Sequence, residues 1–333
     1  MIHTAQATRT VAVLGTGSIG TRHLNVLRQI AEVEPIAVPR RPERVRELAA
    51  GGHAAVSTLQ EAVARGASLA IIATDTGRHV EDGVAALAAG LDLLVEKPLA
   101  RDAIEAASLV AEAGQRGKQI FVGCVLRFSE SLGVFREWLP MVGRLHSVRV
   151  ECQSYLPDWR PQRPYQHSYS ARRNEGGVLR DLIHEIDYTG WIFGWPAALQ
   201  ARLTNTGTLG IEIEEAAELA WDTAQGCAVS VRVDYLTRPT RRLVLACGRD
   251  GTIQWDGVEG RVTLARVGEP IRTAHASQQR DAMFLAQALA VLHAKPGAID
   301  ERLATGEDGV RALAVCDAAR RASAHRREEQ VAC

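Results

Sequence analysis

Between residues 9 and 123, short apolar runs alternate with amphipathic helical stretches. The strand candidates span residues 10–14, 35–38, 69–73, 92–95 and 119–122. Helix boundary signals stand between them: Pro42 suits a first helical position, Thr58 and Glu61 have capping-box spacing, and Gly90 and Gly117 follow helical runs. This rhythm predicts βαβ units that build a parallel sheet.

From residue 145 onward the pattern changes to alternation. In AVSVRVDYL the side chains of Val229, Val231 and Val233 share one face, which is typical of an antiparallel sheet with one covered face. Further strands are predicted in RRLVLACG, GTIQWDG and RVTLARVG, and helical patterns return at 279–293 and 306–322. The closing residues HRREEQVAC are expected to fray. The pattern predicts two domains, 1–123 and 124–333, the second an α+β domain with a large, mainly antiparallel open sheet.

The string GTGSIG directly follows the first predicted strand and opens a helical stretch. In that context the first glycine permits a tight turn, the second lets the backbone approach a pyrophosphate, and the third lets helix and strand pack closely. A glycine turn without a ligand is the alternative. We predict an α/β Rossmann domain, a doubly wound parallel sheet that binds NAD(P) at the helix N-terminus. The candidate contacts here are Gly15, Thr16, Gly17, Ser18, Ile19 and Gly20.

The residues after the second predicted strand bear on the choice of cofactor. NAD-selective sites usually carry an acidic residue about 20 residues beyond the glycine string. This chain has Arg40 and Arg41 there instead. Guanidinium groups suit a 2′-phosphate by charge and by bidentate geometry. The sequence favours NADP(H), with NAD(H) as the alternative and Arg40 as the preferred contact, unless both arginines are solvated surface charges.

Lys97 follows the predicted strand at residues 92–95. In doubly wound sheets, ligands bind outside the carboxyl ends of the strands, so this topology brings Lys97 toward the nicotinamide. There it is expected to exchange a proton with a substrate hydroxyl or carbonyl. A lysine after a strand is by itself usually a surface residue, and its coincidence with the glycine string favours the functional interpretation.

A second polar group lies in EGGVLRDLIHEID. On one helix, Asp181, His184 and Asp187 are spaced three apart and share a face. A histidine among apolar residues is more often structural than catalytic. The carboxylate one turn earlier, following a Gly-Gly pair, favours a site.

GTGSIG, the EKP triplet at 96–98, Arg127 in GCVLRF and GGVLRDLIHEID together resemble the Gfo/Idh/MocA family, and the likeness runs along nearly the whole chain. The resemblance implies that Lys97 is the acid/base lysine, that Asp181 and His184 are its active-site partners, and that the bond from Lys97 to the following proline is cis. Which of the two partners relays the proton stays open. The further cofactor contacts that the resemblance implies are Thr74, Asp75, His79, Glu96, Lys97 and Arg127.

Three positions depart from the family pattern. Glu175 replaces the first of three glycines, and Asp75 stands where a proline is usual. Asp181 and His184 are also one residue closer together than in the inositol dehydrogenases. Spacings of three and four both keep side chains on one helical face, so the roles are expected to survive.

An aromatic, basic and proline-rich segment precedes the Asp181 helix. Aromatic faces suit sugar C–H surfaces, and arginine suits carboxylate or phosphate. The stretch from DWRP to YS resembles family members associated with nucleotide-sugar and surface-polysaccharide biosynthesis. A loop that merely packs on the sheet or on another subunit is the alternative. The candidate substrate contacts are Lys97, Trp159, Arg160, Tyr165, Tyr169, Asp181 and His184.

Composition excludes several function classes. Acidic and basic residues balance at 39 each, so neither nucleic acid nor a membrane is expected as a partner. The apolar runs are far shorter than the ~20 residues of a membrane helix. The cysteines lack CxxC spacing, so no metal site is expected and the cytoplasm is the default location. The uncovered sheet face predicts a homodimer or homotetramer.

Three functions remain after this reading. The leading hypothesis is an NAD(P)-dependent oxidoreductase that transfers a hydride at a secondary alcohol or ketone of a sugar or nucleotide sugar. The second is a redox-assisted glycosidase or epimerase whose cofactor is reduced and reoxidised within one turnover. The third is a dinucleotide-binding protein without catalysis, which the joint presence of Lys97, Asp181 and His184 disfavours.

Overall fold

The computed structural model describes residues 8–276 and 279–332. Two compact units are formed, and each is described by itself. Unit 1 runs to Ala100, resumes over Ile104–Gly123 and takes in Arg280–Glu307; unit 2 holds the other described residues. The division predicted from the sequence, 1–123 and 124–333, stays a prediction, because compactness alone does not show which segment folds independently.

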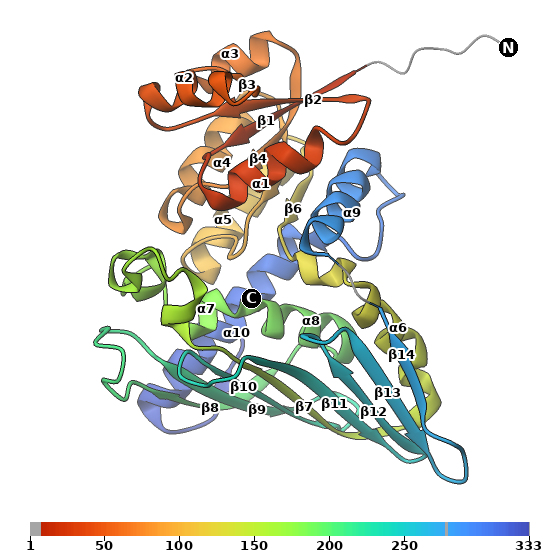
Figure 1. The fold of residues 1–333 in the computed structure, drawn as a ribbon. Helices are drawn as coiled ribbons and strands as arrows, with labels where there is room; N and C mark the ends of the chain where they lie inside the picture. The colour runs from red at the N-terminus through yellow and green to blue at the C-terminus, as the bar shows by residue number, and fades with distance from the viewer. Residues whose placement is uncertain (1–7, 277–278, 333) are drawn as a thin grey trace, which may run out of the picture. The chain divides into compact units, whose positions relative to one another are not determined.

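Unit 1 contains the predicted parallel sheet (Figure 1). Its strand order is β3-β2-β1-β4-β5-β6, with β15 added antiparallel at the β6 edge. The first six strands run in the order typical of a dinucleotide-binding Rossmann sheet. The strands are β1 (Arg9–Leu14), β2 (Val33–Val38), β3 (Ala54–Ala55), β4 (Ala67–Ile72), β5 (Asp92–Val95), β6 (Ile120–Val122) and β15 (Ala304–Thr305).

The helices of unit 1 begin and end close to the signals in the sequence. Pro42 is the first residue of α2, and the Thr58 hydroxyl accepts a hydrogen bond from the Glu61 amide at the start of α3. Gly90 and Gly117 have positive φ just after α4 and α5. The helices are α1 (Ser18–Leu27), α2 (Pro42–Ala50), α3 (Leu59–Ala64), α4 (His79–Ala88), α5 (Ala103–Gln115) and α9 (Arg280–His293).

Unit 2 is built on the second predicted sheet, in which β7 and β10 pair in parallel and the other pairs are antiparallel. Its order is β14-β13-β12-β11-β7-β10-β9-β8-β16. The strands are β7 (Leu145–Gln153), β8 (Ala198–Thr204), β9 (Ala216–Asp222), β10 (Ala228–Asp234), β11 (Arg241–Gly248), β12 (Gly251–Asp256), β13 (Arg261–Arg266), β14 (Arg272–His275) and β16 (Glu329–Gln330).

One face of this sheet is buried and the other is open. Val229, Val231 and Val233 are at most 2% exposed, whereas Ser230 between them is partly exposed and Arg232 is exposed. Helices pack over the buried face (Figure 1). The predicted alternation and the predicted fold class are therefore confirmed. The helices of unit 2 are α6 (Glu130–Trp138), α7 (Val178–Asp181), α8 (Ile183–Phe193) and most of α10 (Gly306–His325).

Two expectations from the sequence are wrong. The chain end was expected to fray, but β16 pairs with β8 and the Val331 amide donates to the Ala197 carbonyl. The single helix expected through Asp181 and His184 is two helices, because the chain bends at Leu182 between α7 and α8. No helix among residues 8–276 and 279–332 is long and apolar enough to cross a membrane.

Candidate functional site

The three glycines after β1 meet three different surroundings. Gly15 has φ +86°, and a Cβ there would lie 2.6 Å from the Ala73 carbonyl oxygen. At Gly20 a Cβ would lie 1.8 Å from the carbonyl oxygen of Gly15. At Gly17 a Cβ would meet no atom of the described residues within 4 Å. Gly15 thus permits a tight turn, Gly20 permits close packing, and Gly17 leaves space for a ligand to approach, as a pyrophosphate-binding loop requires.

The start of α1 is exposed and accessible to an anion. Gly17 is the N-cap residue, and no described side chain caps it. Gly17 and Ser18 are exposed, while Thr16 and Ile19 are partly buried. Backbone N–H groups and the helix dipole favour an anion at such an end. The loop therefore fits a dinucleotide pyrophosphate.

Two arginines follow β2 directly. Arg40 and Arg41 are both exposed, and Arg41 is the N-cap residue of α2. The chain has no acidic side chain between Val38 and Pro42. This strand end therefore offers positive charge where ribose-binding carboxylates usually stand.

The segment after β4 is held by its own polar side chains. The Thr74 hydroxyl donates to Asp82 at 2.8 Å, and the next residue, Asp75, is exposed. His79 is buried, with Nδ1 2.9 Å from the Pro98 carbonyl oxygen and Nε2 3.1 Å from the Thr74 carbonyl oxygen. A carbonyl only accepts, so both bonds form together only on an imidazolium. Burial lowers the pKa of His79 despite these two acceptors.

Lys97 is the second residue after the end of β5. The Lys97–Pro98 peptide bond is cis, as predicted. Lys97 is partly exposed, whereas Glu96 and Pro98 on either side are buried. Since the carboxyl ends of β1 and β5 lie at one edge of a parallel sheet, Lys97 and the glycine loop follow strands at the same edge.

In unit 2, Asp181 is held by a tyrosine. The Tyr235 hydroxyl donates to Oδ2 of Asp181 at 2.6 Å. Burial, then the Asp181 charge, raise the pKa of Tyr235 well above its usual value, so the phenol keeps its proton and donates. The Trp159 ring packs edge-on against Tyr235, with 5.5 Å between ring centroids.

The bend at Leu182 changes the predicted arrangement around His184. Asp181 ends α7 and is 2% exposed, while His184 is near the start of α8 and is partly exposed. Asp187 was expected to line the same face as these two residues. Its carboxylate instead binds Arg127, through Nη2 at 2.7 Å and Nε at 2.9 Å.

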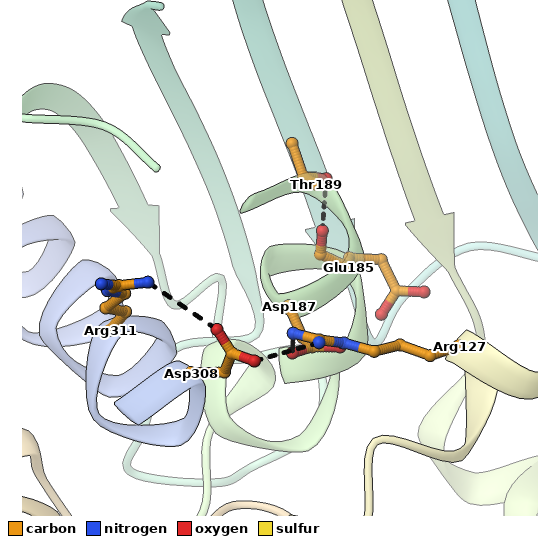
Figure 2. A network of polar contacts seen from close by, with 6 residues as sticks. All are labelled: Arg127, Glu185, Asp187, Thr189, Asp308 and Arg311. Carbon is orange, nitrogen blue, oxygen red and sulfur yellow. Dashed lines mark hydrogen bonds and ion pairs between the residues drawn. The ribbon is translucent and has the colours of Figure 1, made fainter. Parts of the chain in front are cut away.

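Arg127 joins two helices of unit 2. Figure 2 shows its guanidinium between Asp187 of α8 and Asp308 of α10, and the Asp308 contact is 3.0 Å. Burial by itself lowers the pKa of Arg127, but the Asp187 carboxylate outweighs burial and raises it above its usual value. In the same view the Thr189 hydroxyl donates to the Glu185 carbonyl. Arg127 thus has a structural task, and a cofactor contact by this residue stays a prediction.

The predicted substrate segment is ordered by its own hydrogen bonds. The indole N–H of Trp159 donates to the Ser154 hydroxyl at 2.7 Å, and the Tyr165 hydroxyl donates to the Leu209 carbonyl at 2.9 Å. Arg160 is exposed, and Tyr169 is partly buried. Trp159 and Tyr165 therefore offer ring surface rather than free polar groups.

Family comparisons agree with this architecture. Residues 9–124 match the model described as an oxidoreductase family with an NAD-binding Rossmann fold, and residues 141–254 match the GFO/IDH/MocA C-terminal domain. The chain is 30% identical over 232 residues to the 4-carboxy-2-hydroxymuconate-6-semialdehyde dehydrogenase of Sphingobium, a match covering 66% of this chain and 71% of that protein. The chain belongs to the Gfo/Idh/MocA family of oxidoreductases.

Other proteins are similar to this chain in sequence or in fold. The myo-inositol dehydrogenase Hyg17 of Streptomyces leeuwenhoekii is 30% identical over 190 residues, and that match spans 56% of each protein, little more than half of the relative's length. A levoglucosan dehydrogenase in complex with NADH has a TM-score of 0.87 at 18% identity, covering 97% of this chain and 99% of that one. The WlbA dehydrogenase of Bordetella pertussis, in complex with NADH and UDP-GlcNAcA, has a TM-score of 0.82 at 21% identity, covering 98% and 99%. These structures show the shared fold.

Two polar residues of the site escaped prediction. Tyr235 ends the run AVSVRVDY, which was interpreted only as a strand with one covered face. His23 is three residues beyond Gly20, and its Nε2 atom lies 2.8 Å from Glu96. The signal for His23 was available, because a histidine on the buried side of a helix needs a polar partner. The partner itself is set by the tertiary fold.

Proposed function

We propose that this protein transfers a hydride between a nicotinamide cofactor and a secondary alcohol or ketone of a sugar or nucleotide sugar. The observation that supports this most is the partly exposed Lys97, between two buried residues, at the sheet edge that also bears the glycine loop. In the proposal Lys97 is the acid/base residue. His184 assists the proton transfer and Asp181, bonded to Tyr235, orients the partner groups.

The residues present fit a dinucleotide. The loop Gly15-Thr16-Gly17-Ser18-Ile19-Gly20 would hold the pyrophosphate, since a Cβ at Gly17 has open space and no described side chain caps α1. Thr74, Asp75 and His79 follow the end of β4, the neighbour of β1, and would border the bound pyrophosphate. When bound, the nicotinamide accepts or supplies the hydride. Lys97 takes the hydroxyl proton in oxidation and returns it in reduction, so acid and base roles alternate with direction.

NADP(H) is the proposed cofactor, with NAD(H) as the alternative. Arg40 and Arg41 are exposed at the end of β2, and no carboxylate stands there to bind ribose hydroxyls. A 2′-phosphate would pair with Arg40 through charge and through the planar guanidinium fork. The family model is described as NAD-binding, so this preference concerns the present chain rather than the family.

The proposed substrate is a sugar, because the names of several similar proteins and complexes contain a sugar or a polyol. Myo-inositol, levoglucosan and UDP-GlcNAcA occur in the names of similar proteins and complexes. The ring surfaces of Trp159, Tyr165 and Tyr169 suit a pyranose, and the exposed Arg160 suits a carboxylate or phosphate. In this proposal residues 124–333 form the substrate-binding and oligomerisation domain, and residues 1–123 form the NAD(P)-binding domain.

A cofactor and substrate screen tests the proposal. The full chain is incubated with NADP or NAD and with myo-inositol, levoglucosan, UDP-GlcNAcA and a semialdehyde, and the absorbance of the reduced nicotinamide is followed. Net reduction with a polyol or sugar is the expected result, and reduction with the semialdehyde alone contradicts the sugar assignment. Substrate conversion without net cofactor change would indicate the redox-assisted glycosidase or epimerase instead. A protein that binds neither dinucleotide would end the proposal.

A further inference from the structure

Three segments of unit 1 enclose the carboxylate of Glu96. Its Oε1 atom lies 2.8 Å from Nε2 of His23 on α1, and its Oε2 atom accepts a hydrogen bond from the Lys97 amide at 3.3 Å. On a third side, a Cβ atom at Gly123 would lie 3.0 Å from the carboxyl carbon and from both oxygens. Glu96 is 8% exposed. The carboxylate is thus fixed from all three sides at the residue before Lys97.

His23 is itself immobilised. It lies on α1, the helix that the glycine loop opens, and is 1% exposed. The Phe284 ring of α9 packs edge-on against it, with 5.1 Å between ring centroids. Because a carboxylate only accepts, Nε2 must carry the proton of this bond. Nδ1 has no hydrogen-bond partner within residues 8–276 and 279–332.

Glu96 keeps its charge in this enclosure. Burial raises the pKa of the carboxyl group, but the hydrogen bond and charge of His23, and then the charge of Lys97, outweigh burial and lower it below its usual value. Glu96 therefore carries a negative charge at neutral pH, at the residue that directly precedes Lys97.

We propose that His23 and Glu96 form a positioning pair for Lys97. The pair links the end of β5 to α1, the helix that begins at the glycine loop. Lys97 therefore has one fixed position relative to a cofactor bound at that loop. This inference rests on the proposed function, and it assigns the Glu96 carboxylate to Lys97 rather than to the cofactor.

Amine labelling tests the position of Lys97 without any substrate. The chain has only three lysines, Lys97, Lys118 and Lys295, so N-hydroxysuccinimide acetate and peptide mass spectrometry give a labelling rate for each. In His23→Leu, the Lys97 rate is expected to change by about twofold or more, because the segment that bears Lys97 has lost its hydrogen-bonded link to α1. Lys118 and Lys295 should keep their rates. An unchanged Lys97 rate in a folded His23→Leu protein overturns the proposal.

Turnover tests the positioning, with the substrate and cofactor that the screen identifies. His23→Leu should lower kcat on the order of tenfold and leave the dissociation constant of the cofactor nearly unchanged. His23→Gln keeps an N–H donor near the Nε2 position and should restore most of kcat. Leu27→Ala is the matched control: it removes buried packing from the same helix, and should lower the melting temperature without lowering kcat.

The two tests separate this inference from the proposed function. If Lys97→Met keeps normal turnover, the proposed function fails, while the labelling rates still test the position of Lys97. If Lys97→Met is inactive but His23→Leu matches wild-type kcat, the positioning role alone fails. Should His23→Leu not fold, the same labelling and kcat measurements on Glu96→Gln decide the proposal.

Discussion

In unit 1 the candidate site residues stand where strands end, whereas in unit 2 they depend on side-chain contacts between distant segments. Gly17 is the third residue after β1 and Lys97 the second after β5, and the parallel strands bring both to one edge of the sheet. Asp181 instead depends on Tyr235, which is 54 residues away, and α8 depends on Arg127. The first arrangement follows from the strand order of the sheet. The second depends on hydrogen bonds and ion pairs between side chains, and these contacts also stabilise the fold.

The largest effect is expected from Lys97→Met, which should lower turnover and leave the stability of the fold unchanged. Loss of an acid/base group lowers kcat by about 10²- to 10⁴-fold, and the glycine loop that would hold the cofactor is untouched. Turnover and NADPH affinity of the variant check this. Lys118→Met, a change of the same kind in unit 1, serves as the control. Near-normal turnover would remove Lys97 from the mechanism.

Arg127→Met should show the opposite pattern in unit 2. Removing one partner of a buried ion pair leaves Asp187 uncompensated, at a cost of about 3–5 kcal/mol in the free energy of unfolding. Denaturant unfolding of the full chain measures it. Arg311→Met is the matched control, since Arg311 is half exposed and lies 3.9 Å from Asp308. Its cost should stay below about 1 kcal/mol. Equal costs for both variants would contradict the comparison between the units.

Arg40→Ala should change cofactor choice without changing stability. The exposed side chain contributes nothing to the core, but loss of a phosphate contact should weaken NADPH binding by about tenfold or more and NADH binding little. Titrations with both cofactors measure the difference. Arg44→Ala, on the helix α2 that follows Arg40, is the control. Equal losses for NADPH and NADH would reject the 2′-phosphate assignment.

The smallest effect concerns His79, a buried residue of unit 1. Burial lowers its pKa from the usual 6.5, so below that pH the unfolded chain binds the proton more readily than the folded chain. The stability that the neutral imidazole provides is complete above about pH 6.5 and falls as pH drops toward the folded-state pKa. The advantage of wild type over His79→Gln in unfolding free energy should therefore shrink between pH 7.5 and pH 5, by about 1.4 kcal/mol for each unit of pKa shift. An advantage that grows on acidification would show that the folded state holds the proton more tightly.

Features that depend on neighbouring residues were predicted well from the sequence. Features that depend on contacts between distant segments were predicted poorly. The glycine loop and the strand over residues 92–95 follow from short motifs, and the covered face of β10 follows from alternation. The return of α9 to unit 1 has no local signal, because it depends on packing between segments far apart. The strand β9, AAELAWD, was missed since alanine and glutamate have low β propensity. The bend at Leu182 was missed because the spacing of Asp181 and His184 suits one helix equally well.

Cofactor binding to two glycine variants tests the central claim most directly. At Gly17 a side chain would enter open space at an extended N-cap residue, so Gly17→Val should keep the wild-type melting temperature and lose NADPH binding by about tenfold or more. At Gly20 a Cβ would lie 1.8 Å from a backbone oxygen, so Gly20→Ala should lower the melting temperature itself. Fluorescence titration with NADPH and NADH, beside thermal unfolding, gives both quantities. A Gly17→Val protein that binds both dinucleotides as wild type does would contradict the account.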